Sequence, residues 1–200
     1  MNYVLPMVIG YLLGSVSFSL LIGKFSKKNI DIRKHGSGNA GATNTLRVLG
    51  VGPAIVVLLL DVLKGVAAVW LGRSLSNGAV WPVILAGLCV IIGHNWPVFF
   101  GFKGGKGIAT TIGVMVTLCL VPSLLAGAVA ILAVVLTRYV SLGSLLFTGL
   151  LPIMLWLTNS QGELLIASVI VAVFAFYKHR NNIRKLIQGK ENKLGVKASN

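Results

Sequence analysis

Long runs of apolar residues alternate with short polar segments along the whole chain. An α-helix needs about 20 apolar residues to cross the hydrocarbon core of a membrane. The run over 108–140 is too long for one crossing, and Pro122, which lacks a backbone N–H, favours a turn within it. The pattern therefore predicts a bundle of about seven transmembrane helices: 2–23, 51–71, 80–100, the two parts of 108–140, 142–157 and 163–177.

The composition supports a membrane protein rather than a soluble domain. Of the 200 residues, 56 % are hydrophobic and 11 % are charged, which is more apolar than an ordinary globular domain. Cys89 and Cys119 both lie inside apolar runs, so we expect small core residues rather than a disulfide or a metal-binding pair. We predict an all-α integral membrane protein in which residues 1–200 form a single transmembrane domain.

The basic residues predict the orientation of this bundle. Lysine and arginine number 18, against 4 aspartates and glutamates. With seven spans, all but two of the 18 fall on one face; Arg73 falls on the other face and Lys64 lies within the second span. Because basic loops stay on the cytoplasmic side, we predict that the N-terminus is outside and the C-terminus is cytoplasmic. The polar segments 24–50, 101–107 and 178–200 then share the cytoplasmic face.

The first polar segment contains the stretch GSGNAGATNTLR, residues 36–47. Glycines permit positive φ, so backbone N–H groups can converge on an anion, and an arginine can bind phosphate with two parallel hydrogen bonds. A flexible linker with an arginine at the membrane interface explains the same residues, and composition alone leaves both interpretations open. The candidate phosphate ligands are Ser37, Gly38, Asn39, Thr43, Asn44 and Arg47.

The second segment, GHNWPVFFGFKGGKGIAT, covers residues 93–110. Lysines and glycine amides at its centre precede a helix predicted to begin near Ile108, whose dipole also favours a bound phosphate. His94 is interpreted as a hydrogen-bonded structural histidine, with an acid or base role as the alternative. The candidate ligands in this segment are Lys103, Gly104, Gly105, Lys106 and Gly107.

The third segment, HRNNIRKLIQGKE, covers residues 179–191. Apolar residues recur in it at helical spacing among basic ones, which predicts a short helix lying in the headgroup layer. His179, Arg180 and Asn182 lie where the last span emerges, so they are expected at the level of the other two segments. Glu191 is expected to pair with a cation or a helix end.

The second span carries two opposite charges, Asp61 and Lys64. They are three residues apart and therefore lie on one face of a helix. We predict an ion pair inside the bundle, because an isolated charge there is costly. The alternative is that Lys64 belongs to another polar cluster.

Carboxylates are scarce, which narrows the chemistry. The first two motifs contain none, which argues against a two-carboxylate hydrolase, a carboxylate-held Mg²⁺ and a proton-relay pump. No acidic residue is near His94 or His179 in the sequence and no GxSxG elbow is present, so a Ser-His-acid triad has little support. We expect neither a metal nor a cofactor. A donor-rich cationic pocket suits a substrate that carries its own charge and activation, such as an acyl phosphate.

These three segments resemble the motifs of the bacterial membrane acyl-phosphate:glycerol-3-phosphate acyltransferases, and the resemblance covers essentially the whole chain. The first motif matches over 36–47, and the second over 102–110 with Gly93, His94 and Pro97 before it. The third matches at His179, Arg180, Asn182, Ile183, Gly189 and Glu191. Lys185 stands where the family has arginine, so a cation remains and only a two-pronged contact is put in question.

The resemblance implies an enzyme of phospholipid synthesis in the bacterial cytoplasmic (inner) membrane. Such enzymes acylate the 1-hydroxyl of glycerol-3-phosphate to give lysophosphatidic acid and inorganic phosphate, the first acylation step, with neither acyl-CoA nor acyl carrier protein as the direct donor. By resemblance, Ser37 and Arg47 serve the reaction centre and bind phosphate. The glycine loop of Gly104, Gly105 and Gly107 binds acyl phosphate. His179 and Asn182 engage glycerol-3-phosphate.

Our hypothesis is direct acyl transfer without an acyl-enzyme. Lys103 and Lys106 hold the acyl-phosphate head, the acyl chain enters between spans, and the proton of the attacking hydroxyl goes to a substrate phosphate or to His179. A transporter of a phosphorylated anion is the alternative, although it predicts polar groups on both faces. A scaffold that binds anionic lipid needs the charges but not the glycine spacing. We expect membrane lipid around a monomer, and neither nucleic acid nor metal as a partner.

Overall fold

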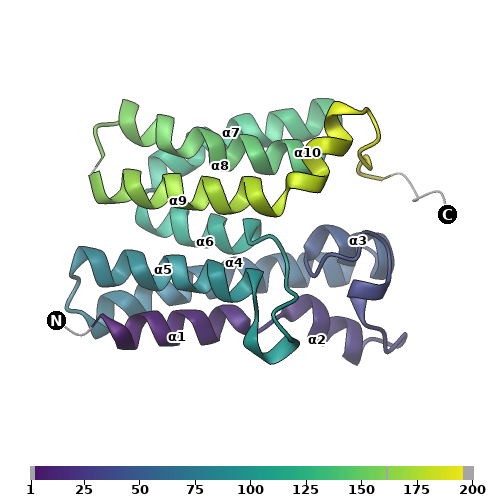
Figure 1. Ribbon diagram of the computed structural model, residues 1–200, viewed down its shortest axis with the longest axis horizontal. Helices are drawn as coiled ribbons and strands as arrows, with labels where there is room; N and C mark the ends of the chain where they lie inside the picture. The colour runs from purple at the N-terminus through teal and green to yellow at the C-terminus, as the bar shows by residue number, and fades with distance from the viewer. Residues whose placement is uncertain (1–2, 161, 196–200) are drawn as a thin grey trace. The chain divides into compact units, whose positions relative to one another are not determined.

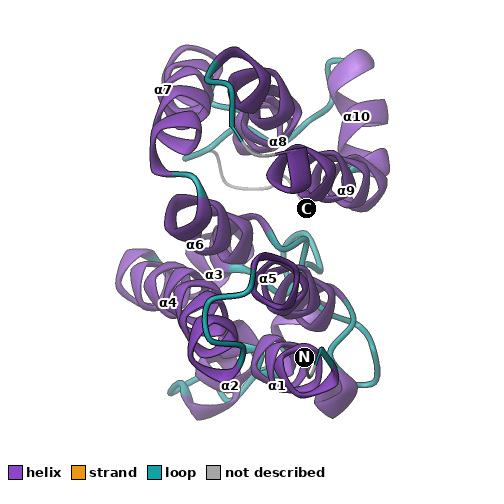
Figure 2. Ribbon diagram, turned by 90° about the vertical axis from the view of Figure 1, so that its left-hand side faces the viewer, coloured by secondary structure: helices purple, strands orange, loops and turns teal. Residues whose placement is uncertain are grey.

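The computed structural model describes residues 3–160 and 162–195, in which helices joined by loops are the regular secondary structure and no β-strand occurs (Figures 1 and 2). Five of its helical segments are long and apolar enough to cross a membrane, and a sixth is if the bent pair Gly162–Lys178 and Arg180–Ile187 forms one span. Ile108–Leu118 is a shorter apolar helix. The predicted all-α membrane architecture is confirmed. The chain divides into two compact units, Met1–Thr117 and Leu118–Asn200, which we describe in turn.

The first unit contains the elements that present the first two polar segments. Its α-helices are α1 (Val4–Ser15), α2 (Phe18–Phe25), α3 (Ala42–Leu49), α4 (Val51–Leu75), α5 (Val80–Asn95) and α6 (Ile108–Leu118), and its 3₁₀ turns are η1 (Ile32–Lys34) and η2 (Val98–Phe100). Helix α1 packs along α5, and α4 packs on both (Figure 2). The helices α3 and α2 carry the first polar segment at one end of this group (Figure 1).

The first predicted span, 2–23, is broken in the structure. Helix α1 ends at Ser15 and Val16 is extended, so carbonyl groups at the break lack helical partners. The ammonium group of Lys64 donates to two of them, the carbonyl of Gly14 at 3.2 Å and that of Val16 at 2.9 Å. A charged side chain from α4 therefore stabilises the break.

Lys64 also forms the predicted ion pair. Its Nζ atom lies 2.8 Å from Oδ1 of Asp61, and both side chains are buried. Nδ1 of His94 lies 3.5 Å from the same carboxylate oxygen. The intramembrane pair is confirmed, and it is part of a larger polar cluster that includes His94 and the α1 break.

Glycines allow the helices of this unit to pack at backbone distance. A Cβ atom on Gly10 or Gly14 of α1 would clash with backbone atoms of α5, and one on Gly93 of α5 would clash with the backbone of α1. Gly65 of α4 and Gly113 of α6 meet each other's helix in the same way. Such small-residue contacts are a usual way to associate helices in a membrane, where apolar burial drives little.

The second unit contains α7 (Leu120–Thr137), α8 (Val140–Leu157), α9 (Gly162–Lys178) and α10 (Arg180–Ile187). The break between α6 and α7 falls at Cys119, and Pro122 lies in the first turn of α7. Our placement of this break at Pro122 is therefore wrong by three residues. The physical reason is that a proline in the first turn of a helix lacks an N–H that would have no helical partner there anyway.

Candidate functional site

The first polar loop, which connects α2 to α3, is organised by Asn44. This side chain is completely buried. Its amide nitrogen donates to the carbonyls of Ile32 and His35, both at 3.0 Å, and its oxygen accepts the backbone N–H of Ser37 at 2.7 Å. Asn44 thus ties the loop to the first turn of α3, and all three of these bonds hold the shape of the loop.

The same loop presents exposed groups above this buried anchor. Gly36 and Gly38 have positive φ angles of 59° and 71°, and Ser37 between them is exposed. Thr43 and Arg47 are half-buried and four residues apart on α3, so they lie on one face of that helix. The Ser37 hydroxyl therefore lies between two glycines in the left-handed conformation, and the Arg47 cation lies on α3, the helix that follows the loop.

The second polar loop leads from α5 to α6 and folds back on the end of α5. The N–H groups of Phe100 and Phe102 both donate to the carbonyl of Pro97, at 3.2 and 2.9 Å. The N–H of Gly105 donates to the carbonyl of His94 at 3.1 Å. This amide serves the fold, while Lys103 is exposed and Lys106 is half-buried at the loop surface.

Gly105 of the second loop lies close both to His94 and to Ala40 of the first loop. A Cβ atom there would fall on Nε2 of His94 and on the carbonyl oxygen of Ala40. Phe100 packs on the small core cluster formed by Leu20, Ile32 and Ala40. The structure thus brings the first two predicted motifs into contact within one compact unit.

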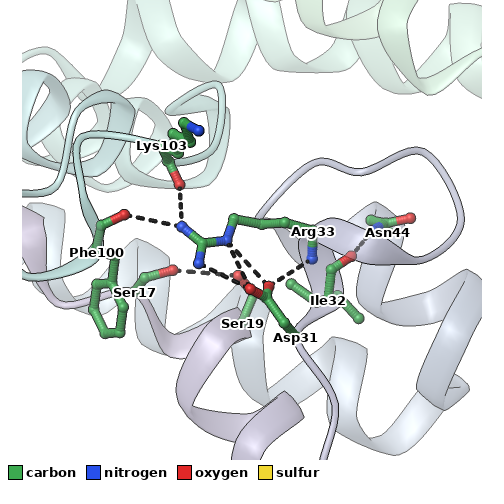
Figure 3. Close-up of polar contacts among 8 residues, drawn as sticks. All are labelled: Ser17, Ser19, Asp31, Ile32, Arg33, Asn44, Phe100 and Lys103. Carbon is green, nitrogen blue, oxygen red and sulfur yellow. Dashed lines mark hydrogen bonds and ion pairs between the residues drawn. The ribbon is translucent and has the colours of Figure 1, made fainter.

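Arg33 joins the loops by hydrogen bonds, a role that sequence reasoning missed (Figure 3). Its Nη1 atom donates to the carbonyl of Phe100 at 2.9 Å and lies 3.4 Å from that of Lys103. Its Nε and Nη2 atoms face the Asp31 carboxylate, with a shortest distance of 2.8 Å. Hydrogen bonding to Arg33 lowers the pKa of Asp31, and the same bond raises the pKa of Arg33.

The third predicted motif lies in the second unit. The chain bends by 64° between α9 and α10, and His179 stands at the bend as a buried side chain. Its Nδ1 atom lies 2.8 Å from the carbonyl of Ala175. A carbonyl only accepts, so Nδ1 carries the proton.

The side chains near this bend have partners of their own. The Asn182 amide donates to Oε1 of Glu191 at 2.8 Å, whereas we expected Glu191 to pair with a cation or a helix end. Arg180 is exposed and stacks on the ring of Tyr177 at 4.6 Å. The predicted short helix of this segment is α10. Residues 196–200, the end of the third predicted cytoplasmic segment, lie outside the described residues.

Neither unit offers an evident metal centre. Within residues 3–160 and 162–195, no group of three or more His, Cys, Asp or Glu side chains is arranged to hold an ion. Apart from His35 and from Asp31, which pairs with Arg33, the polar side chains of the two loops are hydroxyls, amides and cations, which suit an anion.

Comparison with known proteins shows the family to which the chain belongs. Residues 4–189 match the family model described as glycerol-3-phosphate acyltransferase. The glycerol-3-phosphate acyltransferase of Shouchella clausii is 57 % identical over 202 residues, covering 98 % of each chain. The enzyme of the same name from Halalkalibacterium halodurans is 55 % identical over 197 residues, covering 96 % of this chain and 95 % of the other.

Solved structures of proteins from this family have the same fold. The crystal structure of PlsY (YgiH), an integral membrane glycerol 3-phosphate acyltransferase in its glycerol 3-phosphate form, superposes with a TM-score of 0.90 at 35 % identity over 96 % of each chain. Its lysophosphatidic acid form gives 0.88 at 35 % identity, over 96 % of this chain and 95 % of the other. The helices and loops described above are thus those of an integral membrane acyltransferase. The chain belongs to the glycerol-3-phosphate acyltransferase family.

Proposed function

We propose that this enzyme transfers an acyl chain directly from acyl phosphate to the 1-hydroxyl of glycerol-3-phosphate, releasing inorganic phosphate. One observation supports the proposal: the first unit joins two polar loops, the first followed by Arg47 on α3 and the second carrying Lys103 and Lys106. An acyl phosphate is a mixed anhydride, so attack by an alcohol requires positioning and charge neutralisation more than a strong enzymic nucleophile.

The acyl-phosphate head is assigned to the second loop. Lys103 is exposed there and presents a point charge suited to phosphate. Lys106 and the backbone of Gly104 and Gly107 complete the assigned site. Gly105 belongs to it through the close approach that it permits, because its own N–H is bonded to His94.

Glycerol-3-phosphate is assigned to the first loop. Arg47 and Thr43 share a face of α3, and Ser37, Gly38 and Asn39 belong to the loop that precedes this helix. The related PlsY structure in a glycerol 3-phosphate form supports an acceptor of this kind. Asn44 acts by holding Ser37 in place.

His179, Arg180 and Asn182 are proposed to engage the glycerol-3-phosphate acceptor. Because Nδ1 of His179 carries a proton for the Ala175 carbonyl, Nε2 is the ring nitrogen that would accept one in the neutral form. The substrate phosphate is the preferred acceptor of the hydroxyl proton, since a phosphate monoester has a second pKa of about 6. No acyl-enzyme is required.

The location follows from the same reasoning. The excess of basic residues in the polar segments supports a cytoplasmic active site in the bacterial inner membrane, with the N-terminus outside. We propose that the chain works as a monomer without metal or cofactor.

One assay tests the reaction and its donor. The purified protein in detergent is given acyl phosphate and glycerol-3-phosphate, and inorganic phosphate release is followed. We expect release only when both substrates are present, and no acylation when acyl-CoA replaces acyl phosphate. Release that is independent of glycerol-3-phosphate, or equal acylation from acyl-CoA, would refute the proposal. A transporter of phosphorylated anions would show no turnover in detergent, where no gradient exists.

A further inference from the structure

Arg33 lies outside the glycine-rich stretch 36–47, and the proposed reaction gives it no task. Its guanidinium nevertheless contacts the second loop through the Phe100 and Lys103 carbonyls, at 2.9 and 3.4 Å. Phe100 and Lys103 are 67 and 70 residues away in the sequence. Figure 3 shows the Lys103 carbonyl directed at Arg33 while its ammonium group points away.

The two carbonyls stand on either side of a strained turn. Gly101 and Phe102 between them have φ angles of 65° and 59°. A left-handed conformation is uncommon for phenylalanine and must be held by surrounding structure. Arg33 donates at both ends of this turn, so it holds the backbone from which the Lys103 side chain departs.

Asp31 in turn fixes Arg33. One carboxylate oxygen accepts the Arg33 backbone N–H at 3.0 Å, and the guanidinium donates to both oxygens, from Nε at 3.1 Å and from Nη2 at 2.8 Å. This planar, two-pronged contact leaves Nη1 directed at the two carbonyls. The charge of Arg33 is thereby neutralised within the protein, and its donors are engaged, unlike those of a cation that binds substrate phosphate.

We propose that Arg33 and Asp31 are positioning residues for the acyl-phosphate site: Asp31 orients Arg33, and Arg33 holds the second loop so that Lys103 meets the acyl-phosphate head. This inference rests on the proposed assignment of acyl phosphate to that loop. The Asp31–Arg33 pair thus holds the second loop, whereas Asn44 holds the first loop.

The proposal predicts a selective effect on one substrate. Removing a charge-assisted hydrogen bond of this kind should raise the KM for acyl phosphate about tenfold in Arg33→Gln and leave the KM for glycerol-3-phosphate within about twofold. A residue that only stabilised the fold would change the amount of folded enzyme, or both KM values together. Arg33→Lys should be intermediate, because one ammonium group cannot span two carbonyls and a carboxylate.

The role of Asp31 is tested by combining its substitution with that of Arg33. Asp31→Asn should raise the same KM, and adding it to Arg33→Gln should cause no further rise, because Asp31 acts through Arg33. Arg73→Gln is the matched control, since Arg73 also donates to a backbone carbonyl of this unit, that of Thr117 at 3.5 Å, but contacts neither loop. It should leave both KM values unchanged.

Hydrogen exchange of the peptide 98–107 gives a readout that does not depend on substrate assignment. Arg33→Gln should speed exchange in this peptide, whereas Arg73→Gln should not. A folded Arg33→Gln with unchanged exchange and unchanged KM, or with equal rises in both KM values, would overturn the proposal. If Arg33→Gln is not recovered folded, the same criteria apply to Arg33→Lys and Asp31→Asn.

The Lys103→Ala variant tests the assignment of acyl phosphate to the second loop separately from the positioning role of Arg33. If Lys103→Ala leaves the KM for acyl phosphate unchanged while Arg33→Gln loosens the loop, the donor-site assignment fails and the positioning of the loop by Arg33 stands. If Lys103→Ala raises that KM and Arg33→Gln changes neither KM nor exchange, the Arg33 proposal fails alone.

Discussion

Nδ1 of His94 lies 3.5 Å from Oδ1 of Asp61, within the membrane-spanning part of the first unit. Both side chains are buried, and the opposite edge of the imidazole faces Gly105 of the second loop. The carboxylate that neutralises Lys64 thus also orients the ring against which the glycine loop packs. His94 therefore contacts both the buried Asp61–Lys64 pair and the second loop.

Asp61→Asn should strongly destabilise the protein, by about 3–5 kcal/mol, because it leaves the Lys64 ammonium buried without its counter-charge. The double variant Asp61→Asn with Lys64→Met should be more stable than Asp61→Asn alone, since no unpaired charge remains. Thermal unfolding in detergent measures both. A double variant that is no more stable than the single one would show that Lys64 matters mainly through its bonds to the Gly14 and Val16 carbonyls.

Gly105→Ala should lower kcat/KM for acyl phosphate at least tenfold, which corresponds to about 1.4 kcal/mol of transition-state stabilisation. The added methyl group meets His94 and the backbone of Ala40, so the two loops must separate. Gly52→Ala is the control, because a Cβ atom there meets open space. Steady-state kinetics of both variants decide the matter, and an active Gly105→Ala would mean that the loops need not touch.

Glu191→Gln should retain most activity, whereas Glu191→Ala should lose about tenfold in kcat, because only the alanine removes the acceptor that holds the Asn182 amide. Initial rates at saturating substrate measure this. If the two variants are equally impaired, the charge of Glu191 rather than its hydrogen bond to Asn182 is what the enzyme requires.

Ser37→Ala should reduce turnover but not abolish it, since Ser37 is proposed to position substrate rather than to carry the acyl group. The loop should keep its shape, because Asn44 binds the backbone N–H of residue 37 and not its hydroxyl. Phosphate release by the purified variant provides the test. Complete loss of activity in a folded protein would reopen the possibility of an acyl-serine.

The Asp31–Arg33 pair should stabilise the protein in a pH-dependent way. Because the pKa of Asp31 is lowered in the fold from 3.8, the pair contributes fully above that value, and the contribution is lost as the pH falls through the folded pKa. The destabilisation caused by Asp31→Asn should thus be constant from about pH 6 to pH 5 and shrink toward zero in stronger acid. Unfolding temperatures of both proteins across this range provide the test, and a difference that grows in acid would contradict the assignment.

Much of the architecture follows from local pattern. Apolar runs predict the helices because each must cover its length of hydrocarbon, and the spacing of Asp61 and Lys64 predicts their pair. The breaks between helices are harder to predict from the sequence. The one at Val16 depends on Lys64, which lies on another helix, and the one at Cys119 does not coincide with the proline that suggested it.

The candidate site was predictable in its residue types but not in its internal contacts. The glycines, lysines and arginine of the first two motifs indicate anion binding by their chemistry. The partners of Arg33, by contrast, are backbone carbonyls, which any residue supplies, so nothing in the sequence marks them. Asn44 and Gly105 likewise look like ligands in sequence, and their atoms turn out to be bonded within the loops.

The glycines that bring helices of the first unit to backbone distance also restrict how a lipid can reach the loops. The seam between α1 and α5 has no room for a methyl group at Gly10, Gly14 or Gly93, and the seam between α4 and α6 has none at Gly65 or Gly113. A hydrocarbon tail is wider than a methyl group and cannot slide through either seam. With the donor head at the second loop, as proposed, its fatty chain must approach by a route other than these two seams.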